Sequence, residues 1–196
     1  MIADSIISAR QLAKRYGDHR VFRDRDVDVA AGGFLLVTGP NGSGKTTLLR
    51  VLAGLAAPSA GELRLPERRE IGYLGHEPLV YRELTPLENL TLFGRLYRVP
   101  ERGERIGMLL ERFGLWDVRH DRVSTFSRGM QQRLGLCRVL LHAPSLLVLD
   151  EPSNALDAEG LELLDGLLAE PGRTYVVATH EPQRVERYAT ERLAFA

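Results

Sequence analysis

The sequence predicts an α/β fold with a mainly parallel central sheet, and three short apolar segments support this prediction. Residues 34–38, 146–149 and 175–179 are continuous runs of strand length rather than alternating patterns. Such runs are typical of strands buried on both faces, as in a parallel sheet covered by helices. Polar residues follow each run, which places them at the carboxyl ends of the predicted strands, where open α/β sheets bind ligands.

The composition is that of an ordinary globular domain and argues against several classes of protein. The 196 residues are 44% hydrophobic and 27% charged, and 26 basic residues balance 26 acidic ones. This balance provides no positive field for a nucleic-acid partner, so we expect none. We find neither a signal-peptide pattern nor an apolar run of the roughly 18 residues that a membrane span needs. A single cysteine, Cys137, argues against an internal disulfide framework and suits a reducing compartment.

The segment after the first of these runs has the pattern of glycine, four residues, glycine, lysine and a hydroxyl residue. Leucines then recur at helical spacing, so the order is strand, glycine loop and helix. This order aims unpaired backbone N–H groups at one point, which attracts phosphate. Lys45 supplies a cation to the β- and γ-phosphates, and Thr46 offers an oxygen to Mg²⁺. The loop residues are Gly39, Pro40, Asn41, Gly42, Ser43, Gly44, Lys45 and Thr46, Thr47 completes the predicted phosphate site, and the helical leucines are Leu48, Leu49, Leu52 and Leu55.

Two acids end the apolar run 146–149. There, Asp150 can hold Mg²⁺ through water, and Glu151 can polarise an attacking water molecule. Two acids that only lead into a turn are the alternative, and a phosphate loop alone is shared by kinases, small GTPases, helicases and transporter ATPases. The combination of both motifs predicts nucleotide hydrolysis.

These motifs and their order resemble the ABC ATPase family, the nucleotide-binding subunits of ATP-binding-cassette transporters, over nearly the whole chain. Segment 126–133 is similar to the family's signature, usually Leu-Ser-Gly-Gly-Gln, and keeps Ser127 and Gly129. The resemblance implies that these two residues touch the γ-phosphate of ATP bound to the opposite subunit. Arg128 replaces a glycine and would either crowd that site or add a cation. Helical spacing after Ser127 predicts that this serine caps a helix, the spaced residues being Met130, Leu134, Cys137 and Leu141.

Further residues take their roles from the resemblance. His180 corresponds to the family's switch histidine, which steadies the γ-phosphate and the attacking water, and segment 153–157 resembles the loop that couples the two sites of a dimer. Tyr16 stands where an aromatic ring stacks on adenine, with a tyrosine packed in the core as the alternative. His76 stands where most members have a glutamine that contacts Mg²⁺, and it either keeps a metal contact or only fills a turn. His76 and the signature variant are similar to the haem-exporter ATPase subunits of cytochrome c maturation.

The resemblance implies a P-loop NTPase fold of the ABC type: one domain over residues 1–196, with a mainly parallel sheet, an N-terminal antiparallel β part and a helical subdomain inserted at about 79–143. Residues 22–29 also read as a strand, and 31–33 as a turn. A capping box, Thr85 to Glu88, opens the helical stretch. We expect Trp116 in its core, together with a stripe of Ile106, Leu109, Leu110 and Phe113.

The resemblance also implies a function. ATP and Mg²⁺ would bind between two copies in a head-to-tail homodimer, and hydrolysis would energise separate integral membrane permease subunits. The chain itself would be cytoplasmic and peripheral on the cytoplasmic face of the inner membrane. Two other classes stay open: a soluble mechanical ATPase, disfavoured because long coiled coils and a second module are absent, and a nucleotide sensor, disfavoured by Glu151 and His180. Within the first class, a haem exporter and an exporter of another substrate are both open, because a substrate need not touch this chain.

Overall fold

The structure is a computed structural model that describes residues 5–195. The chain forms two compact units. Among the described residues, the first unit holds 5–73, 145–151 and 170–195, and the second unit holds 74–144 and 152–169. The predicted subdomain boundaries of about 79 and 143, and the assignment of the whole chain to one domain, stay predictions.

The first unit contains an antiparallel sheet of three strands. Strand β1 (Ser5–Tyr16) pairs with β2 (His19–Ala30) on one side and with β4 (Ala60–Arg64) on the other. The N-terminal antiparallel part and the strand expected at 22–29 are therefore present, the latter within a longer β2.

The second sheet of the first unit has five strands in the order β5-β6-β7-β3-β8. The pairs β6–β7, β7–β3 and β3–β8 are parallel, which confirms the predicted sheet. Asp150 and Val37 both lie opposite Ala178, so the carboxyl ends of three central strands meet at one edge. The strands are β3 (Phe34–Thr38), β5 (Ile71–Leu74), β6 (Leu146–Asp150), β7 (Thr174–Ala178) and β8 (Glu191–Ala194).

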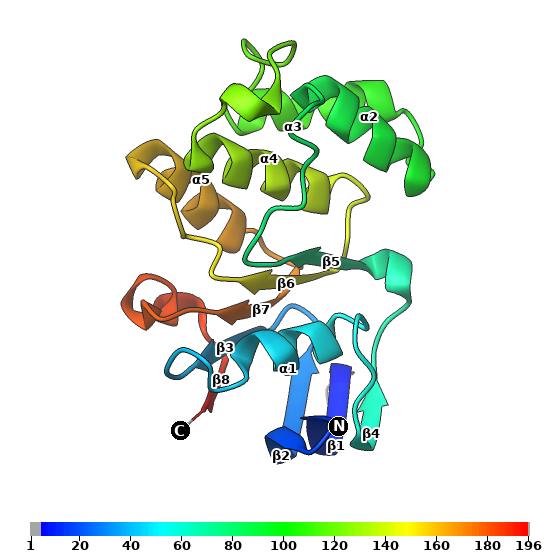
Figure 1. The fold of residues 1–196 in the computed structure, drawn as a ribbon, viewed down its shortest axis with the longest axis vertical. Helices are drawn as coiled ribbons and strands as arrows, with labels where there is room; N and C mark the ends of the chain where they lie inside the picture. The colour runs from blue at the N-terminus through cyan, green and yellow to red at the C-terminus, as the bar shows by residue number, and fades with distance from the viewer. Residues whose placement is uncertain (1–4, 196) are drawn as a thin grey trace. The chain divides into compact units, whose positions relative to one another are not determined.

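Helix α1 (Lys45–Leu52) packs into a hydrophobic core to which both sheets contribute (Figure 1). The helix buries Leu48, Leu49, Val51 and Leu52 completely. It ends earlier than the leucine spacing predicts, because Gly54 adopts a left-handed conformation (φ 68°) and the N–H of Leu55 turns back to the carbonyl of Arg50. Leu55 is therefore 46% exposed instead of continuing the buried stripe.

The second unit is helical, and Figure 1 shows α2, α3 and α4 grouped together. The predicted capping box is confirmed: Thr85 Oγ1 accepts from the N–H of Glu88 at 3.2 Å, and a carboxylate oxygen of Glu88 accepts from the N–H of Thr85 at 2.9 Å. The helices are α2 (Pro86–Leu96), α3 (Arg102–Arg112), α4 (Arg128–Leu140) and α5 (Ala158–Leu168). Short 3₁₀ turns in the chain occupy Arg68–Glu70, Val123–Thr125, Pro182–Arg184 and Glu186–Tyr188.

The expected core stripe of the second unit is confirmed, but Trp116 does not belong to it. Ile106, Leu109, Leu110 and Phe113 are all buried, whereas Trp116 is 37% exposed. The Arg119 guanidinium lies 4.0 Å from the Trp116 ring centroid and donates to the Trp116 carbonyl oxygen at 2.7 Å. The cation covers one face of the indole, so the ring is stable at the surface without entering the core.

Candidate functional site

The glycine loop (residues 39–46) connects β3 to α1 in the first unit. Gly39 and Gly44 have φ values of 144° and 105°. A Cβ atom at Gly39 would lie 2.7 Å from the carbonyl oxygen of Phe195, and one at Gly44 would lie 2.8 Å from Val21 Cγ1. Backbone angle and space therefore both require glycine at these two positions.

The glycine loop gathers hydrogen-bond donors. Gly44 occupies the N-cap of α1 and provides no side-chain cap for the N–H groups of the first turn. The Ser43 hydroxyl oxygen is buried and has no hydrogen-bond partner in the part of the chain that the structure describes. Lys45, only 6% exposed, folds over the loop and donates from Nζ to the carbonyl oxygens of Gly39 (2.8 Å) and Pro40 (3.0 Å). Amides, a hydroxyl and an ammonium group in one loop match an anionic phosphate chain.

The residues predicted to bind Mg²⁺ in the first unit lie together. The Thr46 hydroxyl donates to Asp150 Oδ2 at 2.7 Å, and Asp150 is 2% exposed at the end of β6. Burial, and to a lesser degree the charge of Asp150, raises the pKa of Tyr73. Among residues 5–195, no cluster of three or more His, Cys, Asp or Glu side chains could hold a metal alone. The oxygen pair suits Mg²⁺, which usually takes one or two protein ligands and completes its shell with water and phosphate oxygens.

Glu151 and His180 are also brought together. Glu151 Oε2 lies 2.8 Å from His180 Nδ1 and accepts a hydrogen bond from the backbone N–H of His180 at 3.2 Å. Glu151 is 8% exposed, whereas half of the His180 side chain is accessible. The Glu151 backbone is left-handed (φ 50°), and its N–H donates to the Ala178 carbonyl at 2.8 Å. Strained backbone that the surrounding sheet holds in place is common where a side chain must be aimed at a reacting group.

Tyr16 lies at the end of β1 and is 51% exposed. The alternative of a tyrosine packed in the core is therefore wrong. The Lys14 ammonium lies 4.8 Å from the ring centroid, which is the geometry of a cation–π contact. Stacking of this ring on adenine stays a prediction.

The second unit carries the signature segment. Ser127 caps α4 as predicted, because its Oγ accepts from the N–H of Met130 at 3.2 Å. Gly129 lies so close to segment 153–157 that a Cβ atom there would lie 2.7 Å from the carbonyl oxygen of Ala155. Arg128 is exposed, so its side chain is accommodated within this unit without crowding. The contacts of Ser127 and Gly129 with ATP stay predictions.

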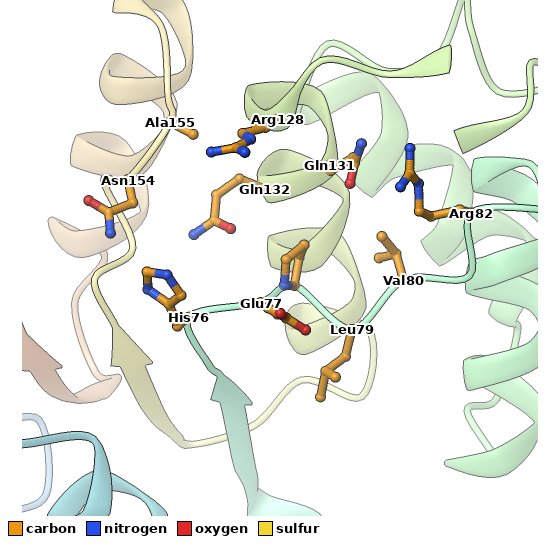
Figure 2. Close-up of a pocket in the computed structure, with 11 residues that line it drawn as sticks. His76, Glu77, Leu79, Val80, Arg82, Arg128, Gln131, Gln132, Asn154 and Ala155 are labelled. Atoms are coloured by element: carbon orange, nitrogen blue, oxygen red, sulfur yellow. The ribbon is translucent and has the colours of Figure 1, made fainter. Parts of the chain in front are cut away.

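The second unit has a cavity of about 840 Å³. Figure 2 shows its lining residues between the segment after β5, the start of α4 and the loop before α5. His76 is exposed on its wall, opposite residues of the signature and of segment 153–157. His76 lies in a bend after β5, so the alternative that it only fills a turn and its metal role both stay predictions. The lining residues are His76, Glu77, Pro78, Leu79, Val80, Arg82, Arg128, Gln131, Gln132, Asn154 and Ala155.

The motifs miss other residues that shape these sites. Val21 and Phe195 flank the glycine loop, and Arg133 of α4 places Nη1 3.3 Å from Glu159 Oε2 and Nη2 4.0 Å from Asp157 Oδ2. Asp157 also accepts from the N–H of Gly160 at 2.9 Å and so caps α5. An apolar residue in a strand and an arginine in a helix carry no signal that distinguishes such contacts from ordinary packing.

A glycine loop on a parallel sheet, a threonine–aspartate pair beside it and a glutamate–histidine pair at the same sheet edge define a nucleotide-binding α/β protein. Comparison with known proteins narrows this class. Residues 22–154 match the family model described as ABC transporter. The chain belongs to the ABC transporter family, as an ATP-binding protein whose family hydrolyses ATP in transporters.

Individual relatives support this assignment. The cytochrome c biogenesis ATP-binding export protein CcmA of Rhizobium meliloti (strain 1021) is 40% identical over 189 residues, which cover 90% of this chain and 91% of that protein. The uncharacterized ABC transporter ATP-binding protein YxlF of Bacillus subtilis (strain 168) is 42% identical over 168 residues, or 82% of this chain. A solved ATP-binding subunit of an ABC transporter superposes with a TM-score of 0.85 at 27% identity and covers 97% of this chain and 85% of its own.

The chain spans 57% of the length of YxlF and 64% of that of YdbJ, a second Bacillus subtilis relative. Across the described residues, every helix is too short or too polar to cross a membrane.

Proposed function

We propose that this chain is the ATP-hydrolysing subunit of an ABC exporter of the cytochrome c maturation type, which moves haem. The observation that carries the hydrolytic part is the convergence of Thr46, Asp150, Glu151 and His180 beside the glycine loop of one unit. These are the groups that phosphoryl transfer requires: a cradle for the phosphates, oxygen ligands for a cation, and an acid to aim water.

The residues divide the work as follows. The glycine loop and Lys45 bind the β- and γ-phosphates, and Lys45 exchanges its bonds to two loop carbonyls for bonds to phosphate oxygens. Thr46 and Asp150 hold Mg²⁺, which neutralises phosphate charge when bound. Glu151 orients a water molecule and accepts its proton at a carboxylate oxygen, while His180 holds that carboxylate in place and offers its exposed ring edge to the γ-phosphate.

The transport cycle needs a second copy of the chain. We infer that two copies close head to tail over ATP, with Ser127 and Gly129 of one copy facing the glycine loop of the other. ATP drives closure only through its greater affinity for the closed state, and hydrolysis removes the group that both copies share. The capped N-terminus of α4 supports this role, since a helix N-terminus favours an anion.

Haem as the cargo is supported by relatives of matching length. Four proteins named CcmA are 35–40% identical and align over 89–92% of their own length. The competing candidate is an exporter of another substrate, which the 37% identity to the daunorubicin resistance ATP-binding protein DrrA3 of Streptomyces coeruleorubidus favours. In either case separate integral membrane permease subunits would carry the substrate, and this chain would bind them at the cytoplasmic face of the membrane.

Calorimetry on the purified chain tests the nucleotide site. We expect heat of binding with ATP and Mg²⁺, its loss in Lys45→Ala, and wild-type binding in Arg95→Ala, which removes one cation from an exposed position on α2. Absence of binding to the wild-type chain, or tight binding to Lys45→Ala, would contradict the assignment.

A second experiment separates the two transport candidates. The gene is deleted in its own host, and mature c-type cytochromes are measured by haem staining of membranes. Loss of these cytochromes, restored by the wild-type gene but not by Glu151→Gln, supports haem export. Normal cytochromes in the deletion strain favour an exporter of another substrate, and copurification with membrane proteins then identifies the permease.

A further inference from the structure

Phe195 lies directly against the glycine loop although it is 149 positions beyond Thr46 in the chain. It follows β8 and is 5% exposed. Its N–H donates to the carbonyl oxygen of Thr38 at 2.8 Å, which extends the pairing of β3 and β8 to the residue before Gly39. The C-terminal strand thus ends where the loop begins.

Phe195 contacts both ends of the loop. At Gly39, an added Cβ atom would lie 2.7 Å from the carbonyl oxygen and 2.8 Å from the Cβ atom of Phe195. At Gly44, an added Cβ atom would lie 3.4 Å from Cε1 of the Phe195 ring. Gly39 therefore packs against the backbone of Phe195, and Gly44 packs against the edge of its ring.

The Phe195 ring is itself held in place. Phe22 of β2 meets it edge to face, with ring centroids 6.1 Å apart and planes at 80°, and the Arg25 guanidinium lies 4.8 Å from its centroid. Val21, the neighbour of Phe22, approaches Gly44 to within 2.8 Å of an added Cβ atom. Both sheets thus contribute a contact to the loop: Val21 of β2 from the first sheet, and Phe195, directly after β8, from the second.

Packing matters here because Lys45 gives up its hydrogen bonds to the carbonyl oxygens of Gly39 and Pro40 when it binds phosphate. The backbone bond from the Ser43 N–H to the Pro40 carbonyl oxygen within the loop is long, at 3.3 Å. Donors must be fixed before the ligand arrives if binding is to avoid the cost of ordering them. We propose that Phe195 is a positioning residue for nucleotide binding, which holds the glycine loop in its phosphate-binding conformation; this inference rests on the proposed function.

The test compares Phe195→Ala with Phe34→Ala. Phe34 is also in the first unit and 3% exposed, but it stacks on Tyr175 and Tyr188 at the opposite end of β3. Calorimetry with ATP and Mg²⁺ gives Kd for each variant, steady-state hydrolysis gives KM and kcat, and circular dichroism gives Tm. Tm should fall in both variants, so that any difference in Kd between them does not come from a difference in stability.

We expect Phe195→Ala to raise Kd and KM for ATP about tenfold or more with kcat within about threefold, because misplaced donors weaken binding of the phosphates. Phe34→Ala should leave Kd within about twofold. Equal Kd values for the two variants would overturn the inference. If either alanine variant fails to fold, the comparison of Phe195→Leu with Phe34→Leu decides it in the same way. Absence of ATP binding by the wild-type chain would instead refute the proposed function.

Discussion

His180 and Glu151 meet through one carboxylate oxygen, Glu151 Oε2, which lies 2.8 Å from His180 Nδ1 and accepts the His180 N–H at 3.2 Å. The register of β6 and β7 explains this contact. Asp150 lies opposite Ala178, and Glu151 and His180 lie just beyond these two strand ends. A carboxylate with one oxygen fixed in this way keeps its other oxygen for a water molecule.

Replacing Glu151 by glutamine tests this division of labour. The amide still accepts from the His180 N–H through its oxygen but cannot take a proton, so we expect kcat to fall about 10²–10⁴-fold. Kd for ATP should stay within about threefold, since the glycine loop is unchanged. Steady-state kinetics and calorimetry measure both values, and size-exclusion chromatography with ATP should show a trapped dimer. Glu181→Gln, which removes an exposed neighbouring acid, serves as the control, and unimpaired turnover in Glu151→Gln would refute the assignment.

The Thr46–Asp150 bond makes a prediction about Mg²⁺. Thr46→Val keeps the shape of the side chain but removes the oxygen that lies 2.7 Å from Asp150 Oδ2. We expect the Mg²⁺ concentration for half-maximal ATPase activity to rise about tenfold, because loss of one ligand or its support typically costs 10–100-fold in metal affinity. Thr46→Ser, which retains the oxygen, should restore most of the wild-type dependence. An unchanged Mg²⁺ titration in Thr46→Val would show that Thr46 takes no part in holding the ion.

Local patterns predicted much of this molecule. Continuous apolar runs identified β3, β6 and β7 because burial on both faces leaves a direct mark on composition. Helix starts at Thr85 and Ser127 were found because capping is a bond between residues three apart. These features need no knowledge of the distant chain.

The features that the sequence did not predict depend on backbone conformation, on a neighbouring side chain or on contacts between distant segments. Helical spacing predicts a helix that reaches Leu55, but Gly54 ends the helix by a backbone conformation that side-chain periodicity does not report. Trp116 was expected inside because it is large and apolar, yet a cation three residues away stabilises it at the surface. Phe195 acts on the glycine loop only through the pairing of β8 with β3, and strand order is not encoded in either segment alone.

Replacing Gly129 by alanine should destabilise the fold, although this substitution in a helix usually stabilises it. Glycine to alanine inside a helix normally stabilises by about 0.5–1 kcal/mol. At Gly129 the new Cβ atom would lie 2.7 Å from the Ala155 carbonyl oxygen, in a loop residue already at φ 63°. We therefore expect Gly129→Ala to destabilise by about 1–3 kcal/mol, the usual cost of overpacking.

Gly166 in α5 is the matched control for this substitution, because a Cβ atom there meets no heavy atom within 4 Å. Gly166→Ala should gain the ordinary helix stabilisation of about 1 kcal/mol. Urea unfolding followed by circular dichroism measures both variants. Equal shifts of the midpoint in the two variants would show that the contact with Ala155 is relaxed without cost.

Cys137 should be inert in the folded chain. It is completely buried in α4, and its Sγ lies 3.5 Å from the carbonyl oxygen of Leu109. Burial raises the pKa of the thiol far above its ordinary range, so the reactive thiolate is absent near neutral pH. We expect a thiol reagent at pH 8 to label the native chain only as fast as the chain opens, at least about 100-fold more slowly than in denaturant. Rapid labelling of the native chain would contradict this burial.

The same pKa shift makes stability depend on pH. An unfolded thiol ionises near pH 8.5 while the folded thiol keeps its proton, so the unfolded state is favoured as the pH rises above that value. The contribution is complete below the unfolded pKa and declines above it, by about 1.4 kcal/mol at pH 9.5. Cys137→Ala lacks the titrating group, so the difference in unfolding free energy between wild type and this variant should shrink by that amount between pH 7 and 9.5. A difference that stays constant over this range would mean that Cys137 ionises equally in both states, and hence that water reaches the thiol inside α4.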